Sequence, residues 1–425
     1  MNKYFNYKTL SLTVLLLALI LSAGVVMAQS AGNLERVIVT FEHEVNEQAV
    51  QALENRGGQV LKSLSLVNGL VVYIPEQAIP ALSTVAGVKT VEKDAVVFAT
   101  QKPEKCSPWP GCRDDGEEEE SIQPPQTVEW GIERIGADLA WAESRGEGVK
   151  VAIIDTGIKK DHADLAANVK GGINFVAPTT GPPQSRIVDP NKWDDDNGHG
   201  THVAGIVAAL DNDIGVVGVG PEVWLYGVKV LDKDGSGYVS DIIDALAWAI
   251  DNEMDVVNMS LGTASDISSF HQAVDSAYAA GLVLVASAGN SGDGNGSTNT
   301  VNYPAKYSSV IAVAATDIND QTPTWSSEGI EVELAAPGVN IRSTWYDGDY
   351  RAISGTSMAS PHVAGVAALL LALEIPAGAD SNNDGQWSPA ELRVVLRDTA
   401  EDLGPAGHDV FYGYGLVRAD WALGL

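Results

Sequence analysis

The chain has 425 residues, of which 45% are apolar and 19% charged, with 43 Gly, 19 Pro and a mean hydropathy of +0.01. This composition is typical of globular proteins and excludes disordered, fibrous and multi-span membrane proteins, while the length predicts more than one folded unit. With 26 Lys+Arg against 56 Asp+Glu, the formal net charge of −30 argues against nucleic acid and anionic lipid as partners.

The first 28 residues have the pattern of a secretory signal peptide. Lys3 and Lys8 precede or flank an apolar run over 10–20, and the small residues Val26 and Ala28 fit a cleavage site after residue 28. A membrane anchor is the alternative, for which this run is short. We therefore expect a secreted, extracellular protein without a stable membrane anchor.

Residues 33–100 carry the pattern of a small separate unit. Strand-like runs occur at Arg36–Phe41, Leu70–Ile74 and Val91–Phe98, and Asn46–Arg56 has helical spacing. Their order predicts a small α+β domain with one sheet.

Residues 101–125 differ from both neighbouring segments in composition. They are rich in Pro and include an acidic run over 114–120, which predicts a mobile linker. Both cysteines of the chain, Cys106 and Cys112, lie in this segment. Export implies an oxidising compartment, so the two could form a local disulfide. A zinc site is disfavoured because no histidine lies nearby.

Residues 126–425 alternate between apolar strands and helix-like runs. The expected strands are Val149–Ile154, Val256–Met259, Leu282–Ala286, Val310–Ala314 and Val332–Ala335. The expected helices include Thr201–Leu210, Ser240–Ile250, Phe270–Ala280 and Met358–Leu373. Buried strands that alternate with helices predict an α/β fold, with a mainly parallel sheet covered by helices on both faces.

Three polar residues fall where such a sheet places its chemistry, beyond the carboxyl ends of the strands. Asp155 follows a predicted strand, whereas His199 and Ser357 each open a predicted helix. A serine hydroxyl becomes a useful nucleophile when a neutral imidazole takes its proton and a carboxylate orients the imidazole. Each residue alone could simply cap a turn or a helix. Together, on an α/β chain, they predict a nucleophilic triad.

The segments around these residues are specific enough to indicate a family. Val151–Gly157, Asn197–Gly205 and Gly355–Gly365 resemble the three signature blocks of subtilisin-like serine proteases, the subtilases. The resemblance covers roughly residues 126–423. Residues 33–100 resemble, more loosely, the propeptide of these enzymes, an intramolecular chaperone and inhibitor.

The resemblance implies an activity and a life history for the protein. It implies a secreted, monomeric serine endopeptidase that hydrolyses protein and peptide substrates through an acyl-enzyme. It also implies a precursor that cleaves itself somewhere within about 100–125. Subtilases use the chain order Asp, His, Ser for their triad, and this chain has the same order.

Further roles follow from the same resemblance. Asn290 would donate its side-chain N–H to the oxyanion, alongside the backbone N–H of Ser357. The positions that match the segments pairing with a peptide substrate are Gly235, Ser236, Gly237, Ser260, Leu261 and Gly262. Those that match an apolar subsite are Val239, Ile242 and Leu261, and those around the primary specificity pocket are Ala288, Gly289 and Asn302. Because the pocket residues are mostly small, we expect a large apolar or aromatic substrate side chain there.

Three other functions are compatible with parts of this pattern. His202, three residues after His199, could suggest a metallohydrolase, but no HExxH-type motif accompanies it, and the resemblance makes His202 and His362 structural. An inactive subtilase-like binding protein would typically have lost an active-site residue. An esterase shares the acyl-enzyme chemistry, although the peptide-pairing segments favour a protease.

Calcium is the cofactor that the resemblance implies. The loop Leu210–Val216 resembles the tight calcium site of subtilases, and an Asn/Asp turn is the alternative. The ligands carried over would be the side chains of Gln126, Asp164 and Asn212 and the carbonyls of Leu210, Ile214 and Val216. All are hard oxygen donors, as Ca²⁺ requires.

A second calcium site is predicted independently of the family. Residues 380–391 fit the register of an EF-hand loop and precede a predicted helix. The ligand positions are Asp380, Asn382, Asp384, the Gln386 carbonyl, Ser388 and Glu391, with Gly385 at the turn. Trp387 departs from the aliphatic residue usual at its position, and an acidic helix-capping turn is the alternative. The run Asp194–Asp196 is interpreted as a solvated loop rather than a third ion site.

Overall fold

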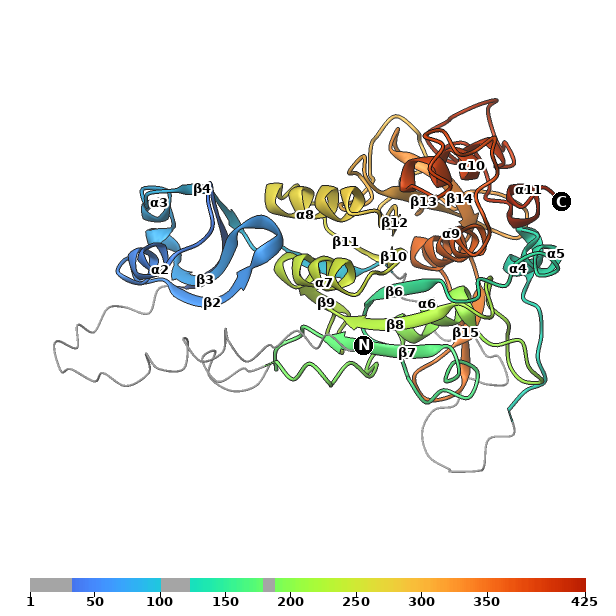
Figure 1. Cartoon of the computed structure of the whole chain (residues 1–425), viewed down its shortest axis with the longest axis horizontal. Helices are drawn as coiled ribbons and strands as arrows, with labels where there is room; N and C mark the ends of the chain where they lie inside the picture. The colour runs from blue at the N-terminus through green and yellow to red at the C-terminus, as the bar shows by residue number, and fades with distance from the viewer. Residues whose placement is uncertain (1–32, 101–122, 179–187) are drawn as a thin grey trace.

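The computed structural model describes residues 33–100, 123–178 and 188–425. The predicted signal peptide and the two cysteines lie outside these ranges. The described chain forms a small N-terminal domain beside a larger main domain (Figure 1).

The N-terminal domain is a four-stranded antiparallel sheet in the order β2-β3-β1-β4. Its elements are β1 (Leu34–Phe41), α2 (Glu47–Glu54), β2 (Gln59–Leu64), β3 (Gly69–Pro75), α3 (Ile79–Leu82) and β4 (Val88–Lys93). The Asn46 side chain caps α2 by accepting the Ala49 N–H at 2.9 Å. Apolar residues of the sheet and of α2 form a core of their own. The predicted small α+β unit is therefore confirmed.

The predicted strand Val91–Phe98 is two strands in two sheets. β4 closes the N-terminal sheet, whereas β5 (Val96–Ala99) lies between β9 (Ser236–Tyr238) and β11 (Leu261–Gly262) of the main domain. The break falls at Asp94, a buried carboxylate that accepts the Ser240 N–H of the main domain at 2.9 Å. The apolar pattern could not show this break, because Ser240, the hydrogen-bond partner of Asp94, lies far away in the sequence.

The main domain is built on a seven-stranded sheet in the order β14-β13-β12-β10-β6-β8-β7. The strands are β6 (Lys150–Asp155), β7 (Val169–Asn174), β8 (Trp224–Lys229), β10 (Val256–Met259), β12 (Val283–Ser287), β13 (Ile311–Thr316) and β14 (Val332–Pro337). All neighbouring pairs are parallel, as predicted. β7 and β8 were not predicted, because glycines interrupt both apolar patterns.

Helices cover both faces of this sheet (Figure 1). They are α4 (Trp130–Arg134), α5 (Ala137–Ala140), α6 (His199–Ala208), α7 (Val239–Asp251), α8 (Ser268–Ala279), α9 (Thr356–Leu371), α10 (Pro389–Asp398) and α11 (Ala419–Ala422). The side chains of β6 alternate between the faces. Val151 and Ile153 join the core that includes α6 and α9, while Ala152 and Ile154 join the core that includes α7 and α8. A separate hairpin, β15 (Ile341–Thr344) with β16 (Tyr350–Ile353), packs near α6.

The N-terminal domain packs against α7 and α8 (Figure 1). Glu92 accepts the backbone N–H groups of Ser268 and Ser269 at 2.7 and 3.1 Å, at the start of α8. Asp94 accepts the N–H and the hydroxyl of Ser240 at 2.9 and 2.7 Å, at the start of α7. Two carboxylates of one domain therefore cap two helices of the other, where the helix dipole favours negative charge.

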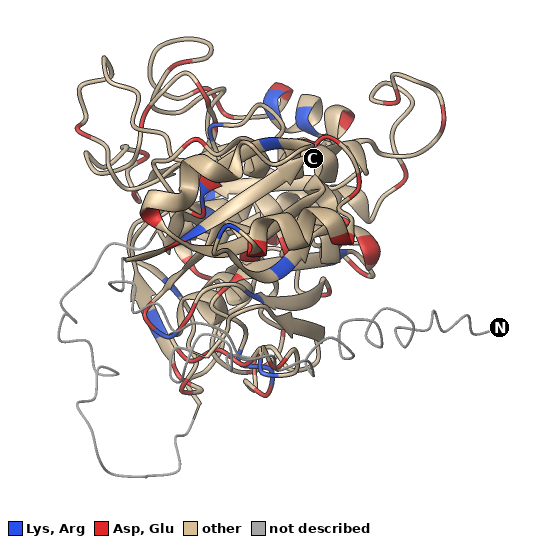
Figure 2. Cartoon of the chain, turned by 90° about the vertical axis from the view of Figure 1, so that its left-hand side faces the viewer, with Lys and Arg blue, Asp and Glu red and all other residues tan. Residues whose placement is uncertain are grey.

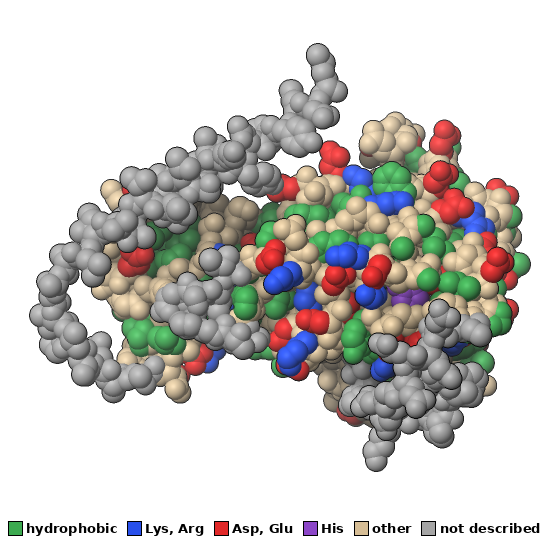
Figure 3. Space-filling view, turned by 90° about the horizontal axis from the view of Figure 1, so that it is seen from below, with side chains coloured by type: hydrophobic (Ala, Val, Ile, Leu, Met, Phe, Trp, Pro, Cys, Tyr) green, Lys and Arg blue, Asp and Glu red, His purple; other side chains and the backbone are tan. Residues whose placement is uncertain are grey.

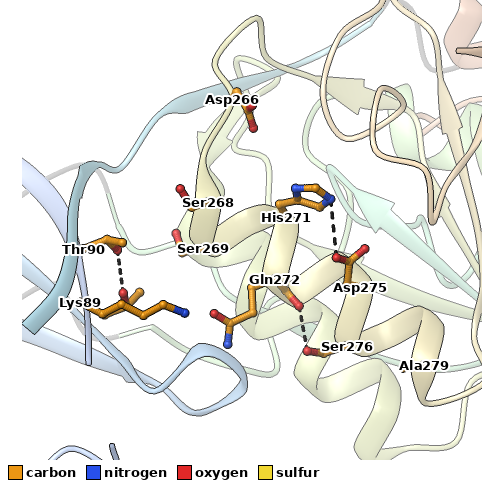
Figure 4. A pocket seen from close by; sticks show the side chains of 11 residues that line it. Lys89, Thr90, Asp266, Ser268, Ser269, His271, Gln272, Asp275, Ser276 and Ala279 are labelled. Carbon is orange, nitrogen blue, oxygen red and sulfur yellow. Dashed lines mark hydrogen bonds and ion pairs between the residues drawn. The ribbon is translucent and has the colours of Figure 1, made fainter. Parts of the chain in front are cut away.

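Ion pairs and apolar contacts complete this interface. Arg36 lies 2.6 Å from Asp94 and 3.2 Å from Asp241, and Lys62 lies 2.6 Å from both Asp241 and Asp244. The apolar side chains that the N-terminal domain contributes to the core of α7 and α8 are Ile38, Leu64, Val67 and Val71. Between Lys89 and α8 the contact opens into a polar pocket of about 600 Å³ (Figure 4).

Charged side chains are distributed over the surface rather than gathered in one patch. Figure 2 shows acidic residues on helices and loops alike, and Figure 3 shows basic and acidic side chains interspersed on the face seen from below. None of the helices in the described parts of the chain is both long and apolar enough to cross a membrane.

The linker predicted over 101–125 ends earlier than its predicted boundary. The Pro124 carbonyl accepts the Gly215 N–H at 2.8 Å, and Pro125 forms a bridge with Ile214. The described end of this segment is therefore part of the main domain.

Candidate active site

Asp155 and His199 form the first pair of the site. Asp155 ends β6 and His199 begins α6, and both are fully buried. The Nδ1 atom of His199 lies 2.8 and 2.9 Å from the two carboxylate oxygens of Asp155. This contact keeps the proton on Nδ1 and leaves Nε2 as the basic nitrogen. Nε2 is buried and has no hydrogen-bond partner among the described residues, so it is placed to receive a proton.

The first turn of α6 packs directly on the segment that follows Asp155. A β-carbon at Gly200 would lie 2.1 Å from the carbonyl oxygen of Gly157. The Gly200 N–H donates to the Thr156 hydroxyl at 2.8 Å. Only glycine permits this approach, which brings the imidazole to the carboxylate.

Ser357 lies at the same edge of the sheet. It is in the first turn of α9 and exchanges two hydrogen bonds with Ser260, the residue that follows β10. Because β10 neighbours β6 in the sheet, Ser357 is beside the strand that carries Asp155. Its hydroxyl donates to the Ser260 carbonyl at 3.1 Å and lies 2.6 Å from the Thr100 hydroxyl. To use His199 as its base, the hydroxyl must turn away from Ser260.

Asn290 follows β12, and its side-chain amide contacts Thr100, the residue that also contacts Ser357. Its Nδ2 donates to the carbonyl oxygen of Thr100 at 2.5 Å. Its Oδ1 accepts the N–H and the hydroxyl of Thr356 at 3.0 and 2.9 Å. These two donors fix which end of the amide faces Thr100. Thr356 adjoins Ser357, but its part in orienting the Asn290 amide was not predicted from the sequence.

The segments predicted to pair with a substrate bind β5 of the same chain. The register joins Val97 to Gly237 and Phe98 to Ser236 on one side, and Phe98 to Gly262 on the other. Leu261 pairs with Ala99 in the ladder. The Gly235 carbonyl accepts the Ala99 N–H at 2.9 Å, and the Ser260 carbonyl accepts the Thr100 N–H at 3.2 Å. Residues 96–100 therefore lie in the cleft as an extended strand that ends beside Ser357.

Two side chains of this strand are buried in the main domain, and one of them lies at the predicted apolar subsite. Val97 is fully buried in the same apolar cluster as Val239, Ile242 and Leu261. Thr100 is buried, and its hydroxyl lies 2.6 Å from that of Ser287.

At the predicted primary pocket, Asn302 lies against Gly289. Gly289 has a φ of +117°, and a β-carbon there would lie 2.8 Å from the Nδ2 of Asn302. The Asn302 N–H donates to the Ala288 carbonyl at 2.8 Å, which fixes Asn302 beside the pocket wall. The Asn302 side chain thus occupies space that a glycine in its place would leave open.

Two further buried histidines, His202 and His362, bind backbone carbonyls. His202 Nε2 lies 3.0 Å from the carbonyls of both Ile341 and Arg351, and His362 Nδ1 lies 2.8 Å from that of Met358. Burial lowers the pKa of His202 to about 3 and that of His362 to about 4. Both are therefore neutral near pH 7 and hold structural positions.

The residues predicted for the first calcium site come together. Asp164 accepts the Nδ2 of Asn212 at 2.9 Å and the Val216 N–H at 3.0 Å, and Gln126 Oε1 accepts the Asn212 N–H at 2.8 Å. Burial raises the pKa of Asp164 to about 6. The carbonyls of Leu210, Ile214 and Val216 accept no hydrogen bond from the described residues.

The loop over 380–391 is organised by its own carboxylates. Asp380 accepts the N–H groups of Asp384 and Gly385 at 3.2 and 3.0 Å. Glu391 accepts hydrogen bonds from Ser388 and Ser381, which lower its pKa to about 2, and forms a capping box at the start of α10. Across the described ranges, no group of three or more His, Cys, Asp or Glu side chains lies close enough to hold a metal ion. The loop therefore has the helix-capping geometry that was the alternative prediction.

Asp195 is a structural residue that the sequence analysis missed. It was interpreted as part of a solvated loop but is buried. One carboxylate oxygen accepts the Thr156 hydroxyl at 2.9 Å and the N–H groups of Asn197 and Gly198, and the other accepts the N–H and hydroxyl of Thr201 at 2.9 and 2.6 Å. It joins the segment after Asp155 to the helix that begins at His199. The acidic run hid this one buried member.

We expect Asp195→Asn to lower the free energy of unfolding by about 2–4 kcal/mol. In the amide, an NH₂ group replaces one of the two accepting oxygens, so it faces N–H and O–H groups that it cannot accept from. Asp194→Asn is the matched control, since Asp194 is an exposed neighbour that pairs only with Lys160 at the surface. It should change stability by less than about 0.5 kcal/mol. Chemical denaturation in a Ser357→Ala background measures both. Equal effects of the two substitutions would contradict this role.

Comparison with known proteins identifies the family of the chain. Residues 146–415 match the Subtilase family. Subtilisin E of Bacillus subtilis (strain 168) is 39% identical over 403 residues, covering 93% of both chains. Subtilisin DY of Bacillus licheniformis is 48% identical over 298 residues, covering 70% of this chain and 99% of the relative. Alkaline elastase YaB of Bacillus sp. (strain YaB) is 44% identical over 307 residues, 72% of this chain and 73% of the relative. The chain therefore belongs to the subtilase family and is a serine endopeptidase.

Proposed function

We propose that the protein is a secreted precursor that cuts its own chain after Thr100 and is then inhibited by the released N-terminal domain. The observation that carries this proposal is the position of the Thr100 carbonyl. It accepts the Nδ2 of Asn290 while Thr100 lies against the hydroxyl of Ser357. We therefore propose that the bond after Thr100 is the one that Ser357 attacks.

The proposed reaction follows from these contacts. Ser357 Oγ attacks the Thr100 carbonyl carbon, and His199 Nε2 takes the hydroxyl proton while Asp155 stabilises the imidazolium. Asn290 donates to the oxygen as it becomes negative, and the backbone N–H of Ser357 is the second proposed donor. The C–N bond breaks, and His199 returns the proton to the nitrogen of Gln101. Water, activated by His199, then hydrolyses the ester and frees the carboxylate of Thr100.

The cut strand would remain as an inhibitor. Backbone pairing on both sides of β5 and the buried Val97 hold it in the cleft. The N-terminal domain adds the helix caps of Glu92 and Asp94. The same caps would assist folding, because they stabilise α7 and α8 before the long-range parallel pairings form. Removal of the domain would release the active enzyme outside the cell.

The specificity that we propose differs from the one expected from pocket residue sizes. Thr100 is the residue before the proposed cut, and Asn302 lies against Gly289 at the predicted pocket. A small or β-branched side chain should therefore be preferred over an aromatic one. The buried Val97 indicates an aliphatic preference three residues earlier. Extended backbone pairing gives affinity with little further sequence choice.

A peptide series tests this specificity in the mature enzyme. The peptides copy residues 97–100 and carry Thr, Ala or Phe at the last position before the scissile bond. We expect kcat/KM for Thr or Ala to exceed that for Phe by about tenfold or more. Replacing the Val97 equivalent with Asp should lower kcat/KM for all three. A preference for Phe would contradict this specificity and would support a pocket wide enough for an aromatic side chain.

We propose calcium as a structural cofactor at the site of Gln126, Asp164 and Asn212. The support is the donor set, in which three carbonyl oxygens without hydrogen-bond partners accompany a buried carboxylate. Bound calcium would place positive charge directly beside this carboxylate. The EF-hand register of 380–391 stays a weaker proposal, because Glu391 is already engaged in capping α10.

Asp164→Asn tests the first calcium site. With calcium about 100-fold above Kd, we expect the wild type to lose about 2.7 kcal/mol of stability in chelator and the variant to lose little. Asp213→Asn, an exposed residue of the same loop, is the control and should respond to chelator like the wild type. Unfolding is followed in a Ser357→Ala background. An equal chelator response in Asp164→Asn would contradict the assignment.

A further inference from the structure

Ser287, the last residue of β12, contacts the side chain of Thr100. It is fully buried, and its hydroxyl lies 2.6 Å from the Thr100 hydroxyl. This is the only hydrogen bond that the Ser287 hydroxyl makes with the described residues. When residues 96–100 leave the cleft, this hydroxyl faces the position that a substrate side chain takes. Because an unpaired polar group in a buried site is costly, the hydroxyl favours a substrate group that can pair with it.

The Thr100 hydroxyl lies between two serine hydroxyls. It is 2.6 Å from Ser287 Oγ and 2.6 Å from Ser357 Oγ. Ser357 donates its own proton to the Ser260 carbonyl at 3.1 Å. Since each hydroxyl has one proton, Thr100 then donates to Ser357, and Ser287 donates to Thr100. A methyl group in place of the Thr100 hydroxyl would therefore leave the Ser287 proton without an acceptor.

The main sheet fixes the position of Ser287. Ser287 pairs with Val313 of β13 in the parallel ladder, and the Ala288 N–H donates to the Val313 carbonyl at 2.9 Å. The contact between Ser287 and Thr100 does not use the proton of Ser357, so it can persist while the nucleophile reacts. A hydroxyl held on a sheet strand is placed more precisely than one on a loop, which suits it to distinguish between substrate side chains.

We propose that Ser287 selects substrates with a hydroxyl on the residue before the scissile bond, namely Thr or Ser. This inference rests on the proposed cut after Thr100, and it adds a chemical preference to the proposed preference for small or β-branched side chains. Size alone does not separate Thr from Val, because the two differ only in a hydroxyl against a methyl group. A site that pairs with a substrate hydroxyl discriminates against the analogue without it far better than an apolar pocket does.

A pair of peptides tests the proposal in the enzyme matured from the full chain. Both copy residues 97–100 and continue past the bond, with Thr or Val at the position of Thr100. We expect kcat/KM for the Thr peptide to exceed that for the Val peptide by about tenfold or more. In Ser287→Ala the two values should lie within about twofold of each other, because the unpaired hydroxyl is gone.

Ser360→Ala is the matched control for Ser287→Ala. It makes the same change at another buried serine, whose hydroxyl donates to Asn258 at 2.6 Å instead. It should keep the parent ratio between the Thr and Val peptides. If Ser287→Ala yields no folded enzyme, Ser287→Cys takes its place, since a thiol is a weaker donor and should also lower the ratio.

The masses of the peptide products separate this inference from the proposed cleavage site. Equal cleavage of the Thr and Val peptides by the parent, after the varied residue, would overturn the role of Ser287 and leave the proposed cut after Thr100 standing. Cleavage of both peptides at another bond would overturn both proposals. A parent ratio that survives in Ser287→Ala or Ser287→Cys would also contradict the role of Ser287 and assign the hydroxyl preference to Ser357.

Discussion

Ser357→Ala should lower kcat for peptide hydrolysis by about 10⁶-fold, the size of the loss measured when the same serine is removed from subtilisin. Without the hydroxyl, no acyl-enzyme forms, and the oxyanion donors and substrate binding contribute only residual acceleration. The junction after Thr100 should also remain uncut in this variant. The measurement is steady-state hydrolysis of a peptide, together with the mass of the purified chain.

Ser360→Ala is the control for this substitution. Ser360 is a buried serine of the same helix, but its hydroxyl donates to Asn258 at 2.6 Å. Its loss should affect stability more than kcat. Residual activity of Ser357→Ala above about 1% of the parent would contradict the assigned nucleophile.

Asn290→Ala should lower kcat by about 10²–10³-fold with little change in KM, again a magnitude measured on subtilisin itself. The amide is already aimed at the Thr100 carbonyl by two contacts with Thr356. Its contribution grows as that oxygen becomes negative, so the loss should appear in the chemical step.

Asn299→Ala provides the comparison, because Asn299 lies exposed on the loop that follows Asn290. It should leave kcat nearly unchanged. A rise in KM without a fall in kcat for Asn290→Ala would assign this residue to ground-state binding instead.

The sequence pointed to the candidate triad because each of its parts is local. Asp155, His199 and Ser357 each lie in a short contiguous pattern at the end of a strand or the start of a helix. The parallel sheet then brings these ends to one edge. The pairing positions of the cleft were predicted for the same reason.

The parts that were missed depend on distant partners. Asp94 looked like an interruption of one strand because its hydrogen bonds go to Ser240. Asp195 looked solvated because its neighbours in sequence are exposed, whereas its donors include Thr156 on another segment. Tertiary contacts decided each case.

The most direct test of this account is the C-terminal residue of the N-terminal fragment released during maturation. Mass spectrometry of that fragment is preferable to sequencing the enzyme, since later trimming can shorten the exposed end of the mature chain. The account predicts a fragment that ends at Thr100 and that appears at a rate independent of protein concentration. A fragment that ends at any residue beyond 100 from its first appearance would contradict it.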